Sequence, residues 1–192
     1  MKKIAYIIAV AGLVFTSCDT KKVDEKMASE INELKDTLSI EQNNQIPGTP
    51  FQEQTLNETF TTLEGNEILF KDILKQHEGK VTVIDVWASW CPDCIKGFPK
   101  LTELQQQFPQ VNYVFLSLDK TTDKWKEAIE KYNLKGSHFH INQKMKDSFG
   151  TSITLDWIPR YIVINEKGEI ILPKAIVADD PNLINIIKLA TS

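Results

Sequence analysis

The feature that most constrains this chain is a buried-strand pattern that leads directly into two closely spaced cysteines. Residues 81–87 form a nearly continuous apolar run rich in β-branched residues, which is typical of a central strand covered on both faces. The sequence Trp90-Cys91-Pro92-Asp93-Cys94 follows at once. Pro92 suits the first turn of a helix, because its missing N–H would have no partner there. The pattern predicts a strand, a short turn and a helix that begins at the first cysteine.

Strands and helices alternate along the rest of the chain. Residues 51–70 resemble a β-hairpin, split by the turn sequence Glu64-Gly65-Asn66. Further segments follow the same reasoning: strands over 111–118, 160–164 and 170–172, and helices over 71–77, 92–108, 123–132 and 181–189. This order predicts an α/β fold with a central mixed β-sheet flanked by helices and an N-terminal β-hairpin extension.

The N-terminus has the pattern of a targeting segment. Lys2 and Lys3 precede an apolar stretch over 4–15, which has the length of a signal-peptide core and is too short to span a bilayer. The stretch ends in Phe15-Thr16-Ser17-Cys18, which resembles a bacterial lipoprotein cleavage site. We therefore expect residues 1–17 to be a lipoprotein signal peptide and Cys18 to carry the lipid that anchors the protein to a membrane. The alternative is an ordinary signal peptide with an incidental cysteine.

The segment after Cys18 is polar and precedes the folded domain. Residues 18–46 are expected to be the lipidated cysteine and a helical stalk or linker, and a short dimerising coiled coil is the alternative. Apolar residues in this segment recur at helical spacing: Val23, Met27, Ile31, Leu34 and Leu38. The breaker sequence at 46–50 marks a boundary, and the domain is expected to cover residues 47–192.

Charge and cysteine number narrow the class of function. The formal net charge is −4, which gives no electrostatic reason to expect a nucleic-acid partner. The chain has three cysteines, and lipidation of Cys18 would leave two in the mature protein. A disulfide between Cys91 and Cys94 would close a very short loop and contribute little as a staple. This pair is therefore expected to serve chemistry.

The predicted position of the pair at a helix N-terminus indicates what that chemistry is. Free backbone N–H groups and the helix dipole favour the thiolate of Cys91, and the thiolate is the nucleophile. Cys94 lies one turn further on the same helix face and can resolve a mixed disulfide. The alternative is half of a zinc site, completed by His138 and His140, which an extended segment would project to one face.

The stretch from about 47 to 175 resembles the thioredoxin superfamily, and within it the exported, membrane-tethered thiol–disulfide oxidoreductases of the TlpA/ResA type. The resemblance rests on Trp90-Cys91-Pro92-Asp93-Cys94 after an apolar strand. It also rests on Asp85, on Pro99 within the helix, and on Ile158-Pro159 before the next strand.

The resemblance implies a role for each of these residues. Asp85 would be a buried acid that exchanges protons with Cys94, because burial disfavours its charged form. Pro99 would bend the helix. Pro159 would be in cis beside the dithiol and would leave the backbone of Ile158 free to pair with substrate. Trp90 would cover the thiols as an apolar lid, whereas Trp87 is expected in the core.

Three departures from the family pattern affect substrate recognition. The tethered group often has Asn where this chain has Asp85. Trp157 occupies a position that is usually small and is expected near the dithiol, after a longer stretch over 150–156. Arg160 adds a cation just past Pro159, where thioredoxins tend to have Thr.

The sequence therefore predicts a protein-disulfide reductase or isomerase that acts on exported proteins at the periplasmic face of the cell envelope. The negative charges of Asp93 and Asp85 oppose thiolate formation and favour a reducing role, with a membrane electron donor. No metal and no cofactor beyond the redox-active disulfide is expected. The alternatives are a non-enzymatic Cu(I)-binding metallochaperone and a peroxidase, although the Pro-x-x-x-Thr-x-x-Cys pattern of peroxiredoxins is missing around Cys91.

Overall fold

The computed structural model describes residues 46–141 and 144–192. All of the described residues belong to one compact unit, Gln45–Ser192. The expected signal peptide, the lipidated Cys18 and the stalk lie outside the described residues.

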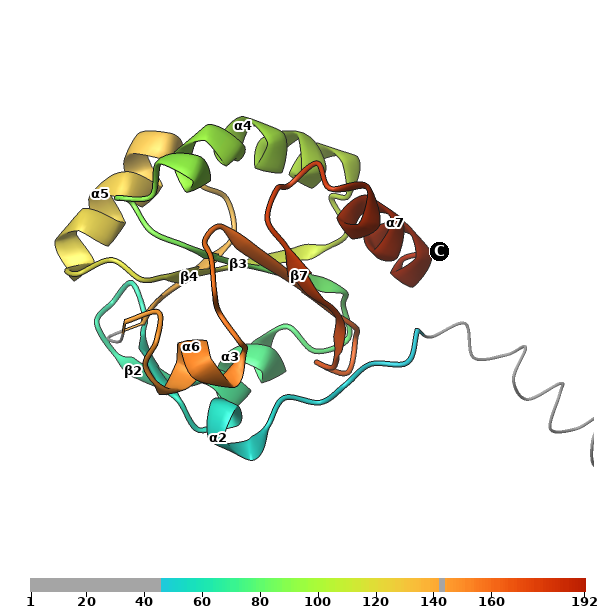
Figure 1. The fold of residues 1–192 in the computed structure, drawn as a ribbon, viewed down its shortest axis with the longest axis horizontal. Helices are drawn as coiled ribbons and strands as arrows, with labels where there is room; N and C mark the ends of the chain where they lie inside the picture. Colours follow the sequence, from blue (N-terminus) through green and yellow to red (C-terminus); the bar gives the residue numbers. More distant parts are fainter. Residues whose placement is uncertain (1–45, 142–143) are drawn as a thin grey trace, which may run out of the picture. The chain divides into compact units, whose positions relative to one another are not determined.

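One mixed β-sheet forms the centre of the described domain (Figure 1). Its seven described strands are β1 (Thr59–Thr61), β2 (Glu67–Leu69), β3 (Thr82–Trp87), β4 (Asn112–Ser117), β5 (Ser137–Ile141), β6 (Arg160–Ile164) and β7 (Ile170–Ala175). They lie in the order β2-β1-β5-β4-β3-β6-β7. The β3–β4 and β4–β5 pairs are parallel and the other pairs are antiparallel. The mixed sheet predicted from the sequence is confirmed.

Helices cover both faces of the sheet. They are α2 (Glu53–Leu56), α3 (Phe70–Gln76), α4 (Pro92–Gln107), α5 (Thr122–Tyr132), α6 (Ser148–Ser152) and α7 (Pro181–Ala190). In Figure 1, α4 and α5 lie on one side of the sheet and α2, α3 and α6 on the other, while α7 packs against β6 and β7. Every residue of β3 and β6 is buried, because both faces of the sheet centre are covered.

Several elements differ from the expectation. The predicted hairpin exists as β1 and β2, with Phe60 opposite Ile68, but the short helix α2 precedes it. Strand β5 and helix α6 had no sequence prediction of their own. The β5 segment Ser-His-Phe-His-Ile is largely buried, but its two histidines interrupt the apolar pattern that would predict a buried strand. Helix α6 has only five residues, too few for a periodic pattern.

The predicted boundary segment is attached to the domain. Backbone N–H groups and carbonyls of Thr49 and Ile170 form two hydrogen bonds of 2.8 and 2.9 Å. At Gly48 a Cβ atom would lie 2.4 Å from the Cβ of Glu169, so only glycine fits this close approach. The breaker sequence is therefore joined to the start of β7 through Thr49.

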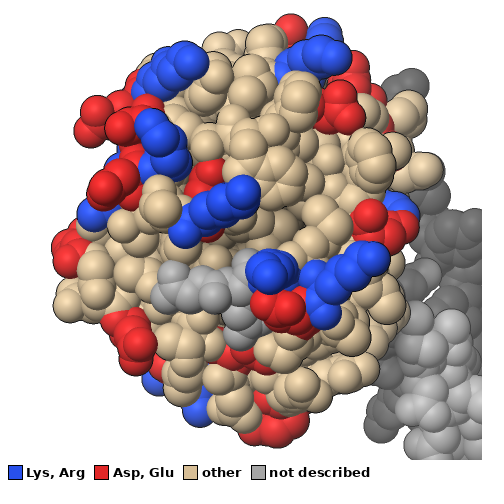
Figure 2. Space-filling model, turned by 60° about the vertical axis from the view of Figure 1, so that its left-hand side comes forward, with Lys and Arg blue, Asp and Glu red and all other residues tan. Residues whose placement is uncertain are grey.

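Charged side chains of both signs are interspersed on the face shown in Figure 2, with uncharged surface between them. No helix among residues 46–141 and 144–192 is long and apolar enough to cross a bilayer.

Candidate active site

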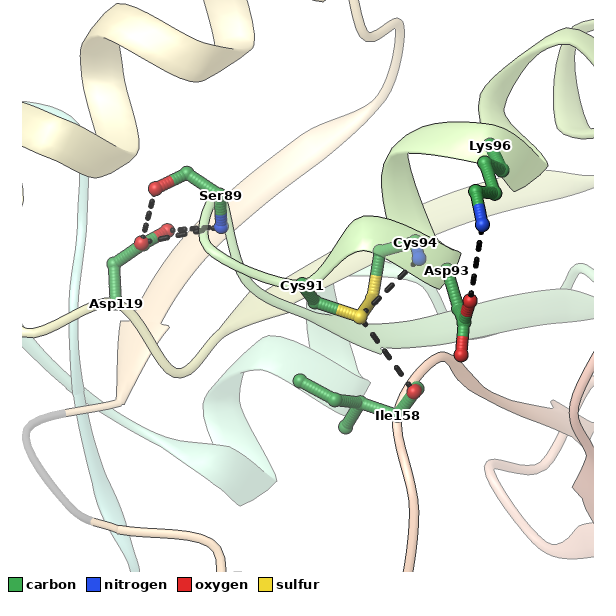
Figure 3. Close-up of a disulfide and its surroundings, with 7 residues drawn as sticks. All are labelled: Ser89, Cys91, Asp93, Cys94, Lys96, Asp119 and Ile158. Atoms are coloured by element: carbon green, nitrogen blue, oxygen red, sulfur yellow. Dashed lines mark hydrogen bonds and ion pairs between the residues drawn. A yellow bond between two sulfur atoms is a disulfide. The ribbon is translucent and has the colours of Figure 1, made fainter.

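The two cysteines lie at the N-terminus of α4 and are joined by a disulfide (Figure 3). Cys91 is the N-cap residue and Pro92 occupies the first turn, as predicted. The backbone N–H of Cys94 points at the Cys91 Sγ, with 3.2 Å between N and S. After reduction, this N–H and the helix dipole would stabilise a Cys91 thiolate. Cys91 and Cys94 are 4% and 1% exposed, so a partner must reach the sulfurs through the adjoining surface.

Ile158 and Pro159 lie directly against the dithiol. The Ile158–Pro159 peptide bond is cis, as the resemblance implied. The Ile158 carbonyl oxygen lies 3.6 Å from the Cys91 Sγ (Figure 3). The chain thus brings together two segments that are 67 residues apart in sequence.

Asp85 is buried on the side of the sheet that faces α4. Side chains alternate along a strand, so Asp85 shares a face with Trp87, whose ring centre lies 5.5 Å from that of Phe98 in α4. Trp87 is fully buried in the core, as predicted. Neither carboxylate oxygen of Asp85 has a hydrogen-bond partner in the described structure. Burial raises the pKa of Asp85 to about 8, so its carboxyl group is largely protonated at neutral pH.

A second acid, Asp119, braces the loop that carries the dithiol. Its carboxylate accepts hydrogen bonds from the Ser89 backbone N–H at 3.1 Å and from the Ser89 hydroxyl group at 2.5 Å (Figure 3). It also accepts a hydrogen bond of 2.8 Å from the Ser117 hydroxyl group. Asp119 is 3% exposed. It was not among the site residues expected from the sequence, although an acidic residue two positions after the buried β4 strand marks the position itself. Asp119 fixes the turn between β3 and α4.

The exposed flanks of the dithiol carry Asp93 and Trp90. Asp93 lies 3.9 Å from the Lys96 amino group (Figure 3), and because this pair is exposed it contributes little to stability. Trp90 is half exposed and lines a pocket of about 600 Å³ with residues that follow β4 and β5. Its role as a lid over the thiols stays a prediction. Pro99 lies within α4, as expected.

A groove of about 310 Å³ lies on the other side of the dithiol. Trp157 and Pro159 line it together with Asp93 and Gly97 of α4. Trp157, the bulky side chain expected near the dithiol, is 54% exposed and forms part of the groove wall. Tyr161 also lines the groove. It is paired with Asp85 across β3 and β6.

His138 and His140 lie on the side of the sheet that α5 covers, where the His140 ring contacts Trp125 of α5. The Nε2 atom of His138 lies 3.2 Å from the Leu134 carbonyl oxygen, and that of His140 lies 2.7 Å from the Asp119 carbonyl oxygen. The rings lie against Phe115 and Trp125, respectively. Among residues 46–141 and 144–192, no three His, Cys, Asp or Glu side chains gather where they could hold a metal ion. The described geometry therefore gives the zinc alternative no ligand set.

Arg160 follows the cis-proline, as the sequence indicated. Its side chain is only 1% exposed and pairs with Asp156, so its charge is internal and already paired.

Comparison with known protein families identifies the same region. A family model described as thioredoxin-like matches residues 79–170. The chain is 35% identical over 66 residues to Thioredoxin-2 of Pyricularia oryzae, covering 34% of this chain and 35% of that protein. It is 27% identical over 121 residues to the thiol-disulfide oxidoreductase ResA of Bacillus thuringiensis, covering 60% of this chain and 64% of ResA. The matches thus span about a third to just under two thirds of these relatives.

Solved structures show the same fold. A crystal structure provisionally assigned as a thiol-disulfide oxidoreductase of Bacteroides vulgatus aligns with a TM-score of 0.60 and 25% identity, over 75% of this chain and 96% of that one. A thiol:disulfide interchange protein from Bacteroides sp. aligns with a TM-score of 0.59 and 24% identity, over 78% and 93% of the two chains. This chain therefore contains a thioredoxin-like domain, and its relatives in sequence and structure include thiol–disulfide oxidoreductases.

Proposed function

We propose that this protein is a thiol–disulfide oxidoreductase that reduces or isomerises disulfides of exported proteins through Cys91 and Cys94. One observation carries the proposal: the disulfide lies at a helix N-terminus, with the Cys94 N–H directed at the Cys91 Sγ and the Ile158 carbonyl beside it. This arrangement favours Cys91 as the nucleophile, because the Cys94 N–H is directed at its sulfur.

The exchange proceeds in two steps. The Cys91 thiolate attacks one sulfur of a substrate disulfide, so a Cys91–substrate bond forms, the substrate disulfide breaks and one substrate thiolate leaves and takes up a proton. Cys94 then loses its proton and attacks the Cys91 sulfur, which releases the second substrate sulfur as a thiol. Two electrons and two protons pass to the substrate, and a dithiol electron donor must reduce the Cys91–Cys94 disulfide again.

Asp85 is proposed to accept the proton that Cys94 loses in the second step. Its pKa of about 8 is near neutral pH, where a general acid–base group works best. Its place on the α4 side of β3 supports this role. The negative charge that Asp85 acquires when it ionises opposes a thiolate at the same site, which favours a reducing protein over a strong oxidant.

The site of action is proposed to be the periplasmic face of the cell envelope. Lys2, Lys3 and the apolar stretch that ends at Cys18 support export and lipid anchoring. A membrane-bound dithiol donor would then lie within reach of the tethered domain. The formal net charge of −4 gives no electrostatic reason to expect a nucleic-acid partner.

A turnover assay tests the proposal against its alternatives. With dithiothreitol as donor, the chain lacking residues 1–17 is expected to reduce insulin disulfides and to leave hydrogen peroxide at the uncatalysed rate. Its reduction potential is expected to lie below about −180 mV, a value typical of protein disulfide isomerase. Tight Cu(I) binding without turnover would instead show a metal carrier, faster peroxide reduction would show a peroxidase, and a potential well above that value would contradict the reducing role.

A further inference from the structure

The loop that precedes the cis-proline is held by a buried arginine. Arg160 follows Pro159 directly, and its Nη1 atom donates to the carbonyl oxygens of Ile153 and Thr154 at 3.4 Å each. Its Nη2 atom donates to the Asp156 carboxylate. The other Asp156 oxygen accepts a hydrogen bond of 2.5 Å from the Lys174 amino group on β7. We call Asp156, Arg160 and Lys174 the loop clamp.

The clamp has a physical reason to persist. A buried guanidinium without a carboxylate partner would be strongly destabilised, so Arg160 draws Asp156 and its loop toward β6. Thr154 in the same loop has a left-handed backbone, with φ of +49°, a conformation that non-glycine residues adopt only where the surroundings enforce it. These contacts hold the loop in the conformation that presents Trp157.

The residue that this loop presents is Trp157, directly after Asp156. Trp157 is 54% exposed, and Ile176 and Val177, which follow β7, are 45% and 49% exposed. All three line the groove of about 310 Å³ beside the dithiol. Neighbouring exposed apolar side chains of this kind mark interaction surfaces.

The charges around the groove do not favour one sign. Lys96 and Lys100 line it together with Asp93 and Asp179, so net charge cannot select a ligand. The apolar side chains distinguish the groove, and Pro159 and Asp93 make it continuous with the dithiol. Its occupant must therefore be apolar and attached to the group that reacts with Cys91.

We propose that the Trp157–Ile176–Val177 groove binds a bulky apolar side chain next to the reactive cysteine of an extended substrate polypeptide, and that Asp156 and Arg160 are positioning residues for Trp157. The inference rests on the proposed oxidoreductase function. The clamp holds the loop before substrate binds. The entropic cost of ordering Trp157 therefore does not reduce the affinity for substrate. Substrates with an apolar neighbour gain contact area, and substrates with a small polar neighbour do not.

Two peptide disulfides that differ only in a leucine or a serine beside each cysteine test this inference. The pre-reduced protein is mixed with each peptide in single turnover, and the second-order rate constants are compared. The wild-type protein is expected to prefer the leucine peptide about tenfold, which is the size of discrimination an apolar site provides. Trp157→Ala is expected to reduce the preference to about twofold or less, mainly through the leucine peptide. The ratio is unaffected by a uniform loss of active protein.

Asp156→Asn tests the clamp by removing the carboxylate partner of the buried Arg160, and the rate ratio is the readout because a uniform loss of folded protein does not change it. The substitution is expected to lower the preference at least about threefold while Trp157 is still present, because the loop is no longer fixed. Leu189→Ala, another half-exposed apolar residue, and Glu127→Gln, in an exposed ion pair on α5, are the matched controls and should keep the wild-type ratio.

The possible outcomes separate the inference from the proposed function. Equal rates for both peptides, or an unchanged ratio in Trp157→Ala, would overturn the groove while the oxidoreductase function stands. An unchanged ratio in Asp156→Asn alone would overturn the clamp. Failure of the wild-type protein to reduce either peptide would overturn the function and the inference together.

Discussion

Replacement of Cys91 by serine is expected to abolish disulfide reduction. The Cys91 sulfur lies at the helix N-terminus and accepts a hydrogen bond from the Cys94 N–H. A serine hydroxyl at neutral pH cannot replace a thiolate as nucleophile. Turnover of insulin disulfides should fall at least about a thousandfold, to the level of the uncatalysed reaction, as is usual when a nucleophile is removed.

Cys18→Ser is the matched control, because it removes the one cysteine of the chain that lies outside the Cys91–Cys94 pair. In a preparation of the full chain it should retain wild-type turnover, since Cys18 is expected to serve anchoring and not chemistry. Wild-type rates in Cys91→Ser would show that another group carries the reaction.

Replacement of Asp85 by asparagine is expected to stabilise the oxidised protein, increasingly so as the pH rises. Burial raises the Asp85 pKa from 3.8 to about 8. Between these values the unfolded chain has released the proton and the folded protein keeps it, so the stability associated with this group is complete below pH 3.8 and is lost as the pH rises through 8. At pH 7 the free energy of unfolding of the wild-type protein should be lower by up to about 4 kcal/mol than below pH 3.8, because of this group. The asparagine variant should show no such decrease from position 85.

The measurement is denaturant unfolding of both oxidised proteins at pH 4 and pH 8. The two free energies of unfolding should differ more at pH 8 than at pH 4, with the variant the more stable. The same variant should reduce insulin disulfides at least about tenfold more slowly, because the proton acceptor for Cys94 is gone. Asp93→Asn removes an exposed acid at the same site and should change stability by less than about 0.5 kcal/mol. A constant stability difference across the pH range would contradict the buried, protonated Asp85.

The parts of the fold that the sequence predicts well are those with strong local signals. Strands β3 and β6 are fully buried runs, and helices α4 and α7 begin with proline after a capping residue. Strand β5 lacks such a signal, because His138 and His140 are polar in sequence and become buried only through contacts with Phe115 and Trp125.

In the candidate site, too, features with a local sequence signal were predicted, and features that depend on tertiary contacts were not. Cys91 caps α4 as the local pattern predicts, and the burial of Asp85 and the cis bond before Pro159 agree with what the resemblance implies. The bracing of Ser89 by Asp119 links residues 30 positions apart, and no local pattern predicts that contact. The sequence indicates a cation at Arg160 but not its burial, which depends on Asp156 and the loop carbonyls around it.

The most direct test of the central claim is to trap the exchange halfway. In Cys94→Ser the resolving sulfur is absent, so a substrate disulfide attacked by Cys91 should remain covalently bound. Mass spectrometry of this variant, incubated with a disulfide peptide, is predicted to show one peptide chain linked to Cys91 and released by dithiothreitol, with no adduct in the Cys91→Ser/Cys94→Ser double variant. Absence of an adduct on Cys91, or an adduct on another residue, would contradict dithiol–disulfide exchange at Cys91 and Cys94.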